Sequence, residues 1–225
     1  MASRGRFITL EGGEGTGKST QVRLLAVRLR TAGLGVVETR EPGGSPGAEA
    51  VRHVLLSGAA EALGPQTEAL LFAAARADHV DHRIVPALTA GRHVVCDRFT
   101  DSTRVYQGAL GRVPVPLLEA LERLVTGAAR PDLTLVLDVP PDIGLARATA
   151  RNAGGADRFE REGAQYHASV RNAFLELAAA DPSRCAVVDA SGSVEEVSDR
   201  IAAVVAQRLH LIDTPEGGGR THAVN

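Results

Sequence analysis

The chain has 225 residues, of which 44% are hydrophobic and 23% are charged, and its formal net charge is −2. This composition excludes an intrinsically disordered chain, and the lack of a basic arm argues against a nucleic-acid partner. No apolar run reaches the roughly 18 residues that cross a membrane, and the first residues do not resemble a signal peptide. We therefore expect a cytoplasmic globular protein without a membrane partner.

Apolar, β-branched runs alternate along the chain with longer segments of helical periodicity. We expect strands near residues 6–11, 35–39, 93–97, 133–138 and 185–189. We expect helices near residues 17–32, 47–57, 66–90, 115–127, 141–151, 160–180 and 194–209. Strands separated by crossover helices predict an α/β fold, with a five-stranded parallel sheet and helices on both faces. Ligands of such sheets bind at the carboxyl ends of the strands.

A glycine-rich loop follows the first predicted strand and fits the phosphate-binding pattern G-x-x-x-x-G-K-[ST]. Its residues are Gly12, Gly13, Glu14, Gly15, Thr16, Gly17, Lys18 and Ser19, with Thr20 next in the chain. Glycines let successive backbone N–H groups point at an anion, and the dipole of the following helix adds positive potential. Because a strand precedes the loop and an apolar helical pattern follows it, a chance glycine-rich turn is the weaker interpretation.

Lys18 is the only lysine among the 25 lysine and arginine residues of the chain. A loop wrapped around a triphosphate has room for a compact ammonium with three donors, whereas a wide planar guanidinium fits poorly. The single exception therefore supports the phosphate-binding interpretation. The hydroxyl of the next residue, Ser19, is a candidate Mg²⁺ ligand.

Two further strand ends carry candidate binding residues. Arg40 closes the second strand before a Pro-Gly-Gly turn, which suits an anion site, although a solvated surface arginine explains this segment equally well by itself. Asp97 and Arg98 close the third strand, where the carboxylate can hold Mg²⁺ through water and the guanidinium can bind a phosphate. An ion pair that only ties down a loop is the alternative. Tyr106 and Gln107 offer a planar wall and an amide suited to a nucleoside.

The helix expected near residues 66–90 has Phe72 and Arg76 four residues apart on one face. Phe72 can stack on a base and Arg76 can donate to a base carbonyl, but the spacing is equally compatible with a core phenylalanine. Residues 152–157 interrupt a helical stretch and resemble the tip of a lid near residues 147–162. The lid arginines are Arg147, Arg151, Arg158 and Arg161, which suit a clamp on a transferring phosphate or a solvated helix face.

The remaining segments point to no metal cluster and to one domain. Cys96 and Cys185 lie in apolar runs and are expected to be small core residues in a reducing compartment. The seven histidines lack metal-ligand spacing, and we expect His79 and His82 to be polar groups of the surface or core. Residues 213–225 resemble a flexible C-terminal tail, so we expect a single domain over residues 1–212.

These motifs together resemble those of bacterial thymidylate kinases. The matching segments occur in the family's order and are residues 12–19, 39–44, 97–99, 102–108, 130–134, 137–139 and 157–159. The resemblance extends from about residue 6 to residue 209, and segment 39–44 is much more specific than the phosphate-binding loop alone. It implies the P-loop fold of nucleoside monophosphate kinases, a homodimer, and a transferase that uses ATP and Mg²⁺ to convert dTMP to dTDP for dTTP biosynthesis.

The resemblance also implies a role for individual residues. The donor side comprises the loop, with Lys18 on the ATP phosphates and Ser19 and Asp97 on Mg²⁺. The acceptor side comprises Glu14 near the sugar or phosphate, Arg40 and Arg98 on the phosphate, Phe72 and Arg76 on thymine, Thr103 and Gln107 near the base, and Tyr106 against the 2′ position. Ser102 is a further substrate-binding residue. The loop contains no arginine, so the chain resembles the lid-arginine type of the family, with Arg151 and Arg158 as catalytic arginines beside Lys18 and Arg98.

Three other functions are alternatives to this one. A GTPase switch is disfavoured because its guanine-reading Asn-Lys-x-Asp motif needs a second lysine. A regulatory nucleotide-binding module without catalysis stays open. A deoxynucleoside kinase needs a carboxylate base, for which Glu11 or Asp97 is available. The acceptor oxygen of dTMP is already anionic, so transfer to it needs positioning and positive charge and no general base.

Overall fold

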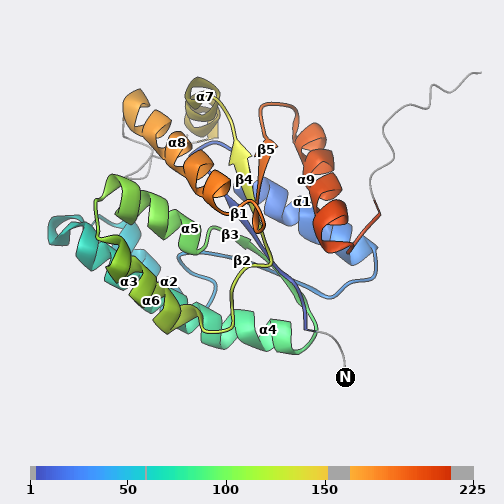
Figure 1. The fold of residues 1–225 in the computed structure, drawn as a ribbon, viewed down its shortest axis with the longest axis horizontal. Helices are drawn as coiled ribbons and strands as arrows, with labels where there is room; N and C mark the ends of the chain where they lie inside the picture. The colour runs from blue at the N-terminus through green and yellow to red at the C-terminus, as the bar shows by residue number, and fades with distance from the viewer. Residues whose placement is uncertain (1–3, 59, 152–162, 214–225) are drawn as a thin grey trace, which may run out of the picture.

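A parallel sheet forms the centre of the computed structural model, which describes residues 4–58, 60–151 and 163–213 (Figure 1). The strands are β1 (Phe7–Glu11), β2 (Val36–Arg40), β3 (His93–Asp97), β4 (Leu133–Asp138) and β5 (Cys185–Asp189). They lie in the order β2-β3-β1-β4-β5, and each neighbouring pair is parallel. The predicted five-stranded sheet is confirmed, and each strand lies within one residue of its expected position.

One face of the sheet is covered by α1 (Lys18–Thr31) and α9 (Val194–Leu209), which lie side by side (Figure 1). Leu25 and Leu29 of α1 pack with Ile201 of α9 in a cluster that includes Leu135 of β4. These apolar residues recur at helical spacing, which is why the sequence pattern predicts both helices. Burial of this stripe fixes α1, and α1 in turn fixes the loop that precedes it.

The opposite face is covered by α8 (Ala164–Ala180) and by α4 (Val85–Thr89). Phe174 of α8 packs with Val136 of β4, and Phe7 of β1 meets the ring of Phe99 edge-on at 4.9 Å between centroids. Further helices are α2 (Pro46–Leu56), the 3₁₀ turn η1 (Glu61–Leu63), α3 (Gly64–His79), α6 (Val115–Thr126) and α7 (Pro141–Arg151). The sheet is therefore covered on both faces, as predicted.

Two helical regions differ from the expected pattern. The single helix expected over 66–90 consists of α3, a π-helical segment η2 (Val80–Ile84) and α4, because Pro86 lacks the N–H that a continuous α-helix requires. No helix is expected over 100–110, yet the structure contains α5 (Thr100–Thr103) and the π-helical η3 (Arg104–Leu110). The first turn of this region, α5, consists of Thr, Asp and Ser residues, which have low helix propensity, so tertiary contacts must stabilise it.

The structure also shows the burial of the cysteines and of two histidines. Cys96 and Cys185 are buried and free, as predicted. His79 is completely buried, whereas the side chain of His82 is 67% exposed. Within residues 4–58, 60–151 and 163–213, no helix has both the length and the apolar character needed to span a membrane.

A buried ion pair connects α5 with β5. Asp101 is completely buried and accepts hydrogen bonds from Arg184, at 2.5 Å from Nη1 and 2.9 Å from Nη2. The hydroxyl of Thr134 in β4 lies 3.3 Å from Asp101 Oδ2 and 2.8 Å from the hydroxyl of Thr9 in β1. The charges are thus matched inside the protein, and removal of one partner leaves the other buried and unpaired.

We expect Arg184→Met to lower the free energy of unfolding by about 3–5 kcal/mol, because Asp101 then keeps a buried charge without its partner. Arg130→Met is the matched control: Arg130 is 74% exposed in its pair with Asp181, so its loss should cost less than about 1 kcal/mol. Denaturant unfolding of the two variants measures the difference. Equal losses would contradict a structural role for the Asp101–Arg184 pair.

Candidate active site

The phosphate-binding loop connects the end of β1 to the first turn of α1. Gly15 and Gly17 have φ angles of 69° and 88°, which favour glycine, and Gly17 is the N-cap of α1. A Cβ on Gly15 would lie 1.9 Å from the carbonyl oxygen of Gly144 in α7. The loop therefore needs glycine for its backbone path and for its packing on α7. It leads into the N-terminus of a 14-residue helix, a place that favours anions.

The side chain of Lys18 folds back over the loop. Its Nζ donates to the carbonyl oxygens of Gly12 at 3.1 Å and Gly13 at 2.7 Å, and it lies 3.3 Å from the Thr16 hydroxyl. Burial lowers the pKa of Lys18 to about 8, and the positive charge of Arg98 acts in the same direction. An ammonium in this position gains from any phosphate that binds at the loop, because an opposite charge favours its charged form.

Ser19 and Asp97 belong to different elements and are in direct contact. The Ser19 hydroxyl, in the first turn of α1, donates to Oδ2 of Asp97 at the end of β3. Mg²⁺ binds hydroxyl and carboxylate oxygens as ligands, and it completes its coordination shell with water and phosphate oxygens. Among the described residues, no three His, Cys, Asp or Glu side chains form a metal-binding group of their own. The pair therefore fits a magnesium ion that is shared with a bound nucleotide.

Arg98 lies at the centre of the site. Its φ of 67° is uncommon for a residue with a side chain and is typical of functional positions. The guanidinium donates to the carbonyl oxygen of Gly12 at 3.3 Å and to the Ser102 hydroxyl at 3.1 Å, and it forms an ion pair with Glu14. Although burial acts against the charge, Tyr106 and Glu14 raise the pKa of Arg98 above its ordinary value. Arg98 thus joins the phosphate-binding loop to the segment that follows β3.

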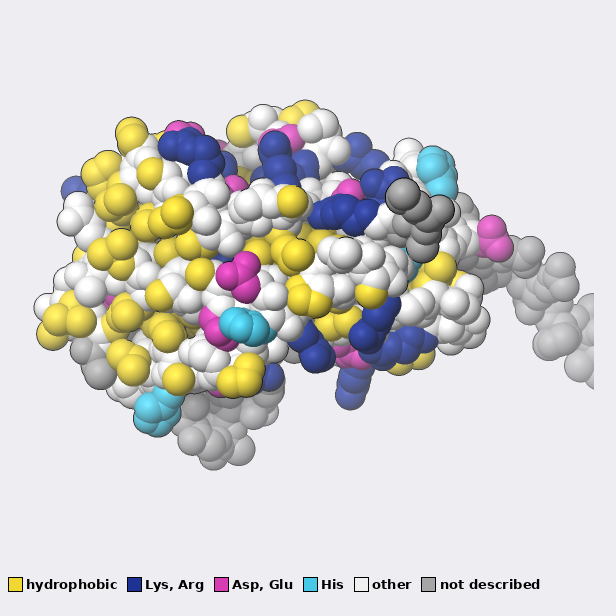
Figure 2. Space-filling view, turned by 90° about the horizontal axis from the view of Figure 1, so that it is seen from below, with side chains coloured by type: hydrophobic (Ala, Val, Ile, Leu, Met, Phe, Trp, Pro, Cys, Tyr) yellow, Lys and Arg dark blue, Asp and Glu magenta, His cyan; other side chains and the backbone are white. Residues whose placement is uncertain are grey.

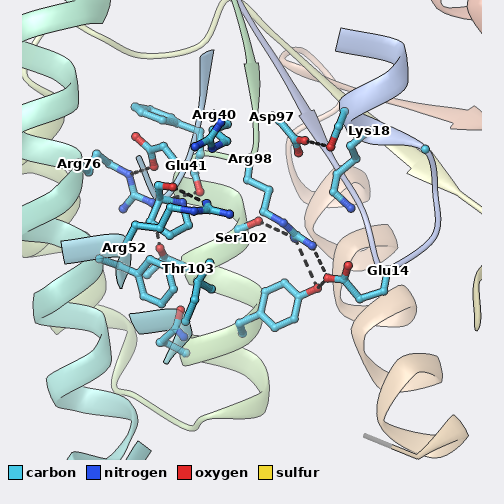
Figure 3. A pocket seen from close by; sticks show the side chains of 18 of the residues that line it. Glu14, Lys18, Arg40, Glu41, Arg52, Arg76, Asp97, Arg98, Ser102 and Thr103 are labelled. Carbon is cyan, nitrogen blue, oxygen red and sulfur yellow. Dashed lines mark hydrogen bonds and ion pairs between the residues drawn. The ribbon is translucent and has the colours of Figure 1, made fainter. Parts of the chain in front are cut away.

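A cavity of about 400 Å³ opens beside this loop (Figure 3). It is lined by most of the predicted site residues, which are Glu14, Gly15, Gly17, Lys18, Ser19, Thr20, Arg40, Phe72, Arg76, Asp97, Arg98, Ser102, Thr103, Tyr106 and Gln107. Gly12, Gly13 and Thr16 instead line a cavity of about 20 Å³ against β4, α7 and α8. The fold therefore brings predicted residues from four separate segments to one place.

Phe72 lies on α3 and forms part of the cavity wall. It is only partly buried, whereas Phe7, Phe99 and Phe174 are completely or almost completely buried. The three buried rings belong to the hydrophobic clusters of the core. The position of Phe72 therefore favours a ring that faces a ligand over a ring that fills the core.

Arg76 lines the same cavity but is only 4% exposed. Its Nε donates to Oε2 of Glu41 at 2.7 Å, and its Nη2 donates to the carbonyl oxygen of Phe99 at 3.2 Å and to the Thr103 hydroxyl at 3.1 Å. Its charge centre also lies 5.2 Å from the centre of the Phe99 ring. Glu41 and Thr103 therefore hold the guanidinium in one orientation at the cavity wall.

Tyr106 and Gln107 come from η3, the helical segment that the sequence pattern does not predict. The Tyr106 hydroxyl donates to Glu14 at 3.4 Å, and burial raises the pKa of Tyr106 above its ordinary value, so the hydroxyl stays protonated. The Gln107 amide nitrogen donates to Glu68 at 3.5 Å. The side chain of Arg40 is 54% exposed, and it donates to Glu49 at 2.9 Å.

The arginines of the predicted lid are only partly described. Arg147 donates to the carbonyl oxygens of Ala190, Ser191 and Gly192 at 2.7, 2.9 and 3.1 Å, so it ties α7 to the loop after β5. Arg151 is the last residue of α7, and its side chain lies outside the described part of the structure. Arg158, Arg161 and the segment 152–157 also lie outside the described residues.

Glu11, at the end of β1, supports the site from beneath. It is completely buried and accepts hydrogen bonds from the backbone N–H of Phe99 at 2.7 Å and of Ser102 at 3.3 Å, and from the Ser102 hydroxyl at 2.6 Å. A carboxylate at these N–H groups stabilises the first turn of α5. Burial and the charge of Asp101 raise the pKa of Glu11 to about 7. Its place at a strand end was visible in the sequence, but this role was not.

Other contributors to the cavity were missed by sequence reasoning, namely Glu41, Pro42, Arg52, Leu56 and Phe99. Arg52 of α2 donates to the carbonyl oxygen of Pro42 at 2.6 Å and so reaches the turn after β2. Glu41 and Pro42 belong to the segment 39–44 that carries the resemblance, which was the available signal. Arg52 and Leu56 carry no motif, because their place in the cavity depends on how α2 packs.

We expect Glu11→Gln to change how stability depends on pH. The pKa of Glu11 in the folded protein, about 7, lies above the ordinary 4.5, so folding favours its protonated form. The contribution of Glu11 to the free energy of unfolding is fully present below pH 4.5 and is lost as pH rises through 7. Glu11→Gln should therefore gain stability relative to the wild type between these values. Thermal or denaturant unfolding across the range measures this, and a constant difference between the two proteins would contradict the raised pKa.

Comparison with known proteins places the chain in a family. The family model described as thymidylate kinase matches residues 10–201. Thymidylate kinase from Bradyrhizobium sp. (strain ORS 278) is 55% identical over 207 residues, which are 92% of each chain. Thymidylate kinase from Afipia carboxidovorans is 56% identical over 207 residues, which are 92% of this chain and 91% of the relative.

A solved structure agrees with this match. The crystal structure of thymidylate kinase from Ehrlichia chaffeensis has a TM-score of 0.71 and 34% sequence identity, and the match covers 90% of this chain and 98% of that one. The matched residues contain the phosphate-binding loop, the Asp-Arg strand end and nearly all of the cavity described above. On its sequence, its fold and its site, the chain belongs to the thymidylate kinase family.

Proposed function

We propose that this member of the thymidylate kinase family transfers the γ-phosphoryl group of ATP to dTMP and forms dTDP, with Mg²⁺ as cofactor. The observation that carries the proposal is the single cavity of about 400 Å³. At one end it is lined by the loop residues Lys18 and Ser19, which suit phosphate and magnesium. At the other it is lined by Phe72 and Arg76, which suit a planar base. A phosphoryl donor and a nucleotide acceptor can therefore meet in one cavity.

The donor side of the site fits the polyphosphate of ATP. Backbone N–H groups of residues 12–20 and the dipole of α1 favour phosphate oxygens, and Lys18 adds a positive charge at the loop. Ser19 and Asp97 are the residues that suit Mg²⁺, and the metal would neutralise charge on the β- and γ-phosphates. Arg151 and Arg158 are proposed to close over the phosphates from a lid near residues 147–162, within a kinase domain that spans residues 1–212.

The acceptor side fits a thymidine monophosphate. Arg98 and Arg40 supply positive charge for the acceptor phosphate, and Glu14 lies within reach of its phosphate or sugar. Thr103 and Gln107 are proposed to lie near the base, and Ser102, which also lines the cavity, is a further proposed binding residue. Tyr106 is proposed to crowd the 2′ position and so to favour deoxyribose. Arg98 contacts both the loop and Tyr106, which supports its position between donor and acceptor.

The arrangement suits transfer to an anionic oxygen without a general base. Glu11 was one candidate base for a hydroxyl acceptor, but both of its oxygens accept hydrogen bonds from Phe99 and Ser102, and it does not line the cavity. Asp97, the other candidate, accepts from Ser19 beside the proposed metal. Glu11 is therefore held away from the cavity, and Asp97 is proposed to hold the metal, so we propose that neither acts as a general base. The obstacle is repulsion between anions, which positive charge and orientation overcome.

We also propose a homodimer. Figure 2 shows hydrophobic side chains gathered on the left of the face in view, the side on which α2, α3 and α6 lie in Figure 1. Exposed apolar side chains on or next to these helices are Val54, Leu63, Leu70, Val115 and Leu124. A patch of this kind is typical of a protein–protein interface, since burial of its apolar surface is favourable.

The function is tested by ATP, Mg²⁺ and a panel of nucleoside monophosphates and deoxynucleosides. We expect dTMP to have the highest kcat/KM. Lys18→Ala should lower kcat/KM by about 100-fold or more, a loss comparable to removal of one preorganised donor. Arg23→Ala is the matched control, because Arg23 is an exposed residue of the same helix. Preference for thymidine over dTMP, or an active Lys18→Ala enzyme, would contradict the proposal.

The role of Phe72 is tested separately. Phe72→Ala should raise KM for dTMP more than it lowers kcat, because stacking acts on the ground state and the transition state alike. The expected cost is about 1–3 kcal/mol, and Phe72→Tyr, which keeps the ring, should stay near the wild type. Steady-state kinetics with a melting curve for each variant measures this. A large loss of Tm with an unchanged KM would show that Phe72 is a core residue.

A further inference from the structure

We propose that His79 is a positioning residue for the nucleotide acceptor. It holds Glu41, and through Glu41 it holds Arg76 at the cavity wall. The inference rests on the proposed function, since the acceptor is dTMP. His79 itself is completely buried in α3 and does not line the cavity, so it can act on a ligand only through its neighbours.

The two ring nitrogens of His79 contact two residues of the same chain segment. Nδ1 lies 3.0 Å from Oε1 of Glu41, and Nε2 lies 2.6 Å from the hydroxyl of Thr39. A carboxylate accepts hydrogen bonds and cannot donate them, so Nδ1 is the donor to Glu41. Thr39 and Glu41 stand on either side of Arg40, where β2 ends. One imidazole of α3 therefore fixes both neighbours of a residue proposed to bind the acceptor phosphate.

The other carboxylate oxygen of Glu41 connects His79 to Arg76 at the cavity wall. Oε2 accepts from Nε of Arg76 at 2.7 Å, and the side chains of Glu41 and Arg76 are each 4% exposed (Figure 3). The bonds of Arg76 use Nε and Nη2, which leaves Nη1 for a ligand in the cavity that Arg76 lines. A guanidinium that is free to rotate would lose this orientation. His79 is thus one bond from the carboxylate that sets the direction of Arg76.

The surrounding backbone is fitted to this arrangement. A Cβ on Gly44 would lie 2.3 Å from the Thr39 hydroxyl and 2.5 Å from Nε2 of His79. The turn after β2 therefore packs directly on the contact between Thr39 and His79. Because β2, the turn and α3 meet at one buried ring, movement of His79 is transmitted to both the phosphate end and the base end of the proposed acceptor site.

The test is the steady-state kinetics of four variants with dTMP and ATP varied independently. His79→Leu should raise KM for dTMP by about 10-fold, since a buried acceptor loses its donor, and it should leave KM for ATP within about 2-fold. His79→Asn puts an amide N–H near the position of Nδ1 and should recover most of the affinity. His79→Gln places its amide near Nε2 and should not. His82→Gln, at an exposed histidine three residues along, should match the wild type.

The outcomes separate this inference from the proposed function. A wild-type enzyme that is inactive on dTMP overturns the proposed function and, with it, the inference. An active wild type whose KM for dTMP is unchanged in His79→Leu overturns only the role of His79. Equal recovery by Asn and Gln, or a uniform fall in activity that follows the folded fraction, also overturns it.

If His79→Leu fails to fold, a milder pair of variants decides the matter. Thr39→Val removes only the hydroxyl next to Nε2 and should raise KM for dTMP about 3-fold without a change in KM for ATP, whereas Thr39→Ser should restore the wild-type value. Equal kinetic constants for Thr39→Val and Thr39→Ser would overturn the inference.

Discussion

The site depends on the contacts of one guanidinium, that of Arg98. It donates to the phosphate-binding loop through Gly12 and to the helical segment after β3 through Ser102, and it is paired with Glu14. These groups belong to two separate parts of the chain that meet only in the folded protein. A planar cation with five donors can satisfy several acceptors at once, which an ammonium cannot do with fixed geometry. Arg98 therefore links the phosphate-binding loop to the segment after β3, which are the proposed donor and acceptor sides of the cavity.

Each of these positive charges in or near the interior is paired with a buried or half-buried carboxylate. Glu14 pairs with Arg98, Glu41 with Arg76, and Asp101 with Arg184. Each pair avoids the large cost of an isolated buried ion, and it also fixes the direction of the arginine. Charge that is oriented before the ligand arrives needs no reorganisation during transfer. Under the proposed function, the same pairing that stabilises the fold would orient positive charge toward an anionic transition state.

Glu11 and Asp97, two of the carboxylates that end strands, have different surroundings. Glu11 bonds backbone N–H groups at the start of α5 and lies beneath the cavity, while Asp97 lies on its wall beside Ser19. Both close a strand, and sequence position alone made both of them candidates for a base. Burial and hydrogen-bond partners separate them, because a carboxylate that already accepts several hydrogen bonds in the interior serves to hold the backbone in place.

The sequence by itself determined the fold class, the strand positions and the phosphate-binding loop, because hydrophobic periodicity and the Gly-rich pattern are local signals. It also identified most of the residues that line the cavity, through motifs at the strand ends. Only the tertiary structure made segment 100–110 helical, because its first turn has low helix propensity and is stabilised by Glu11 of β1. It likewise decided the contribution of Arg52 and Leu56 and the place of His79, since packing between β2, α2 and α3 brings together residues that share no local pattern.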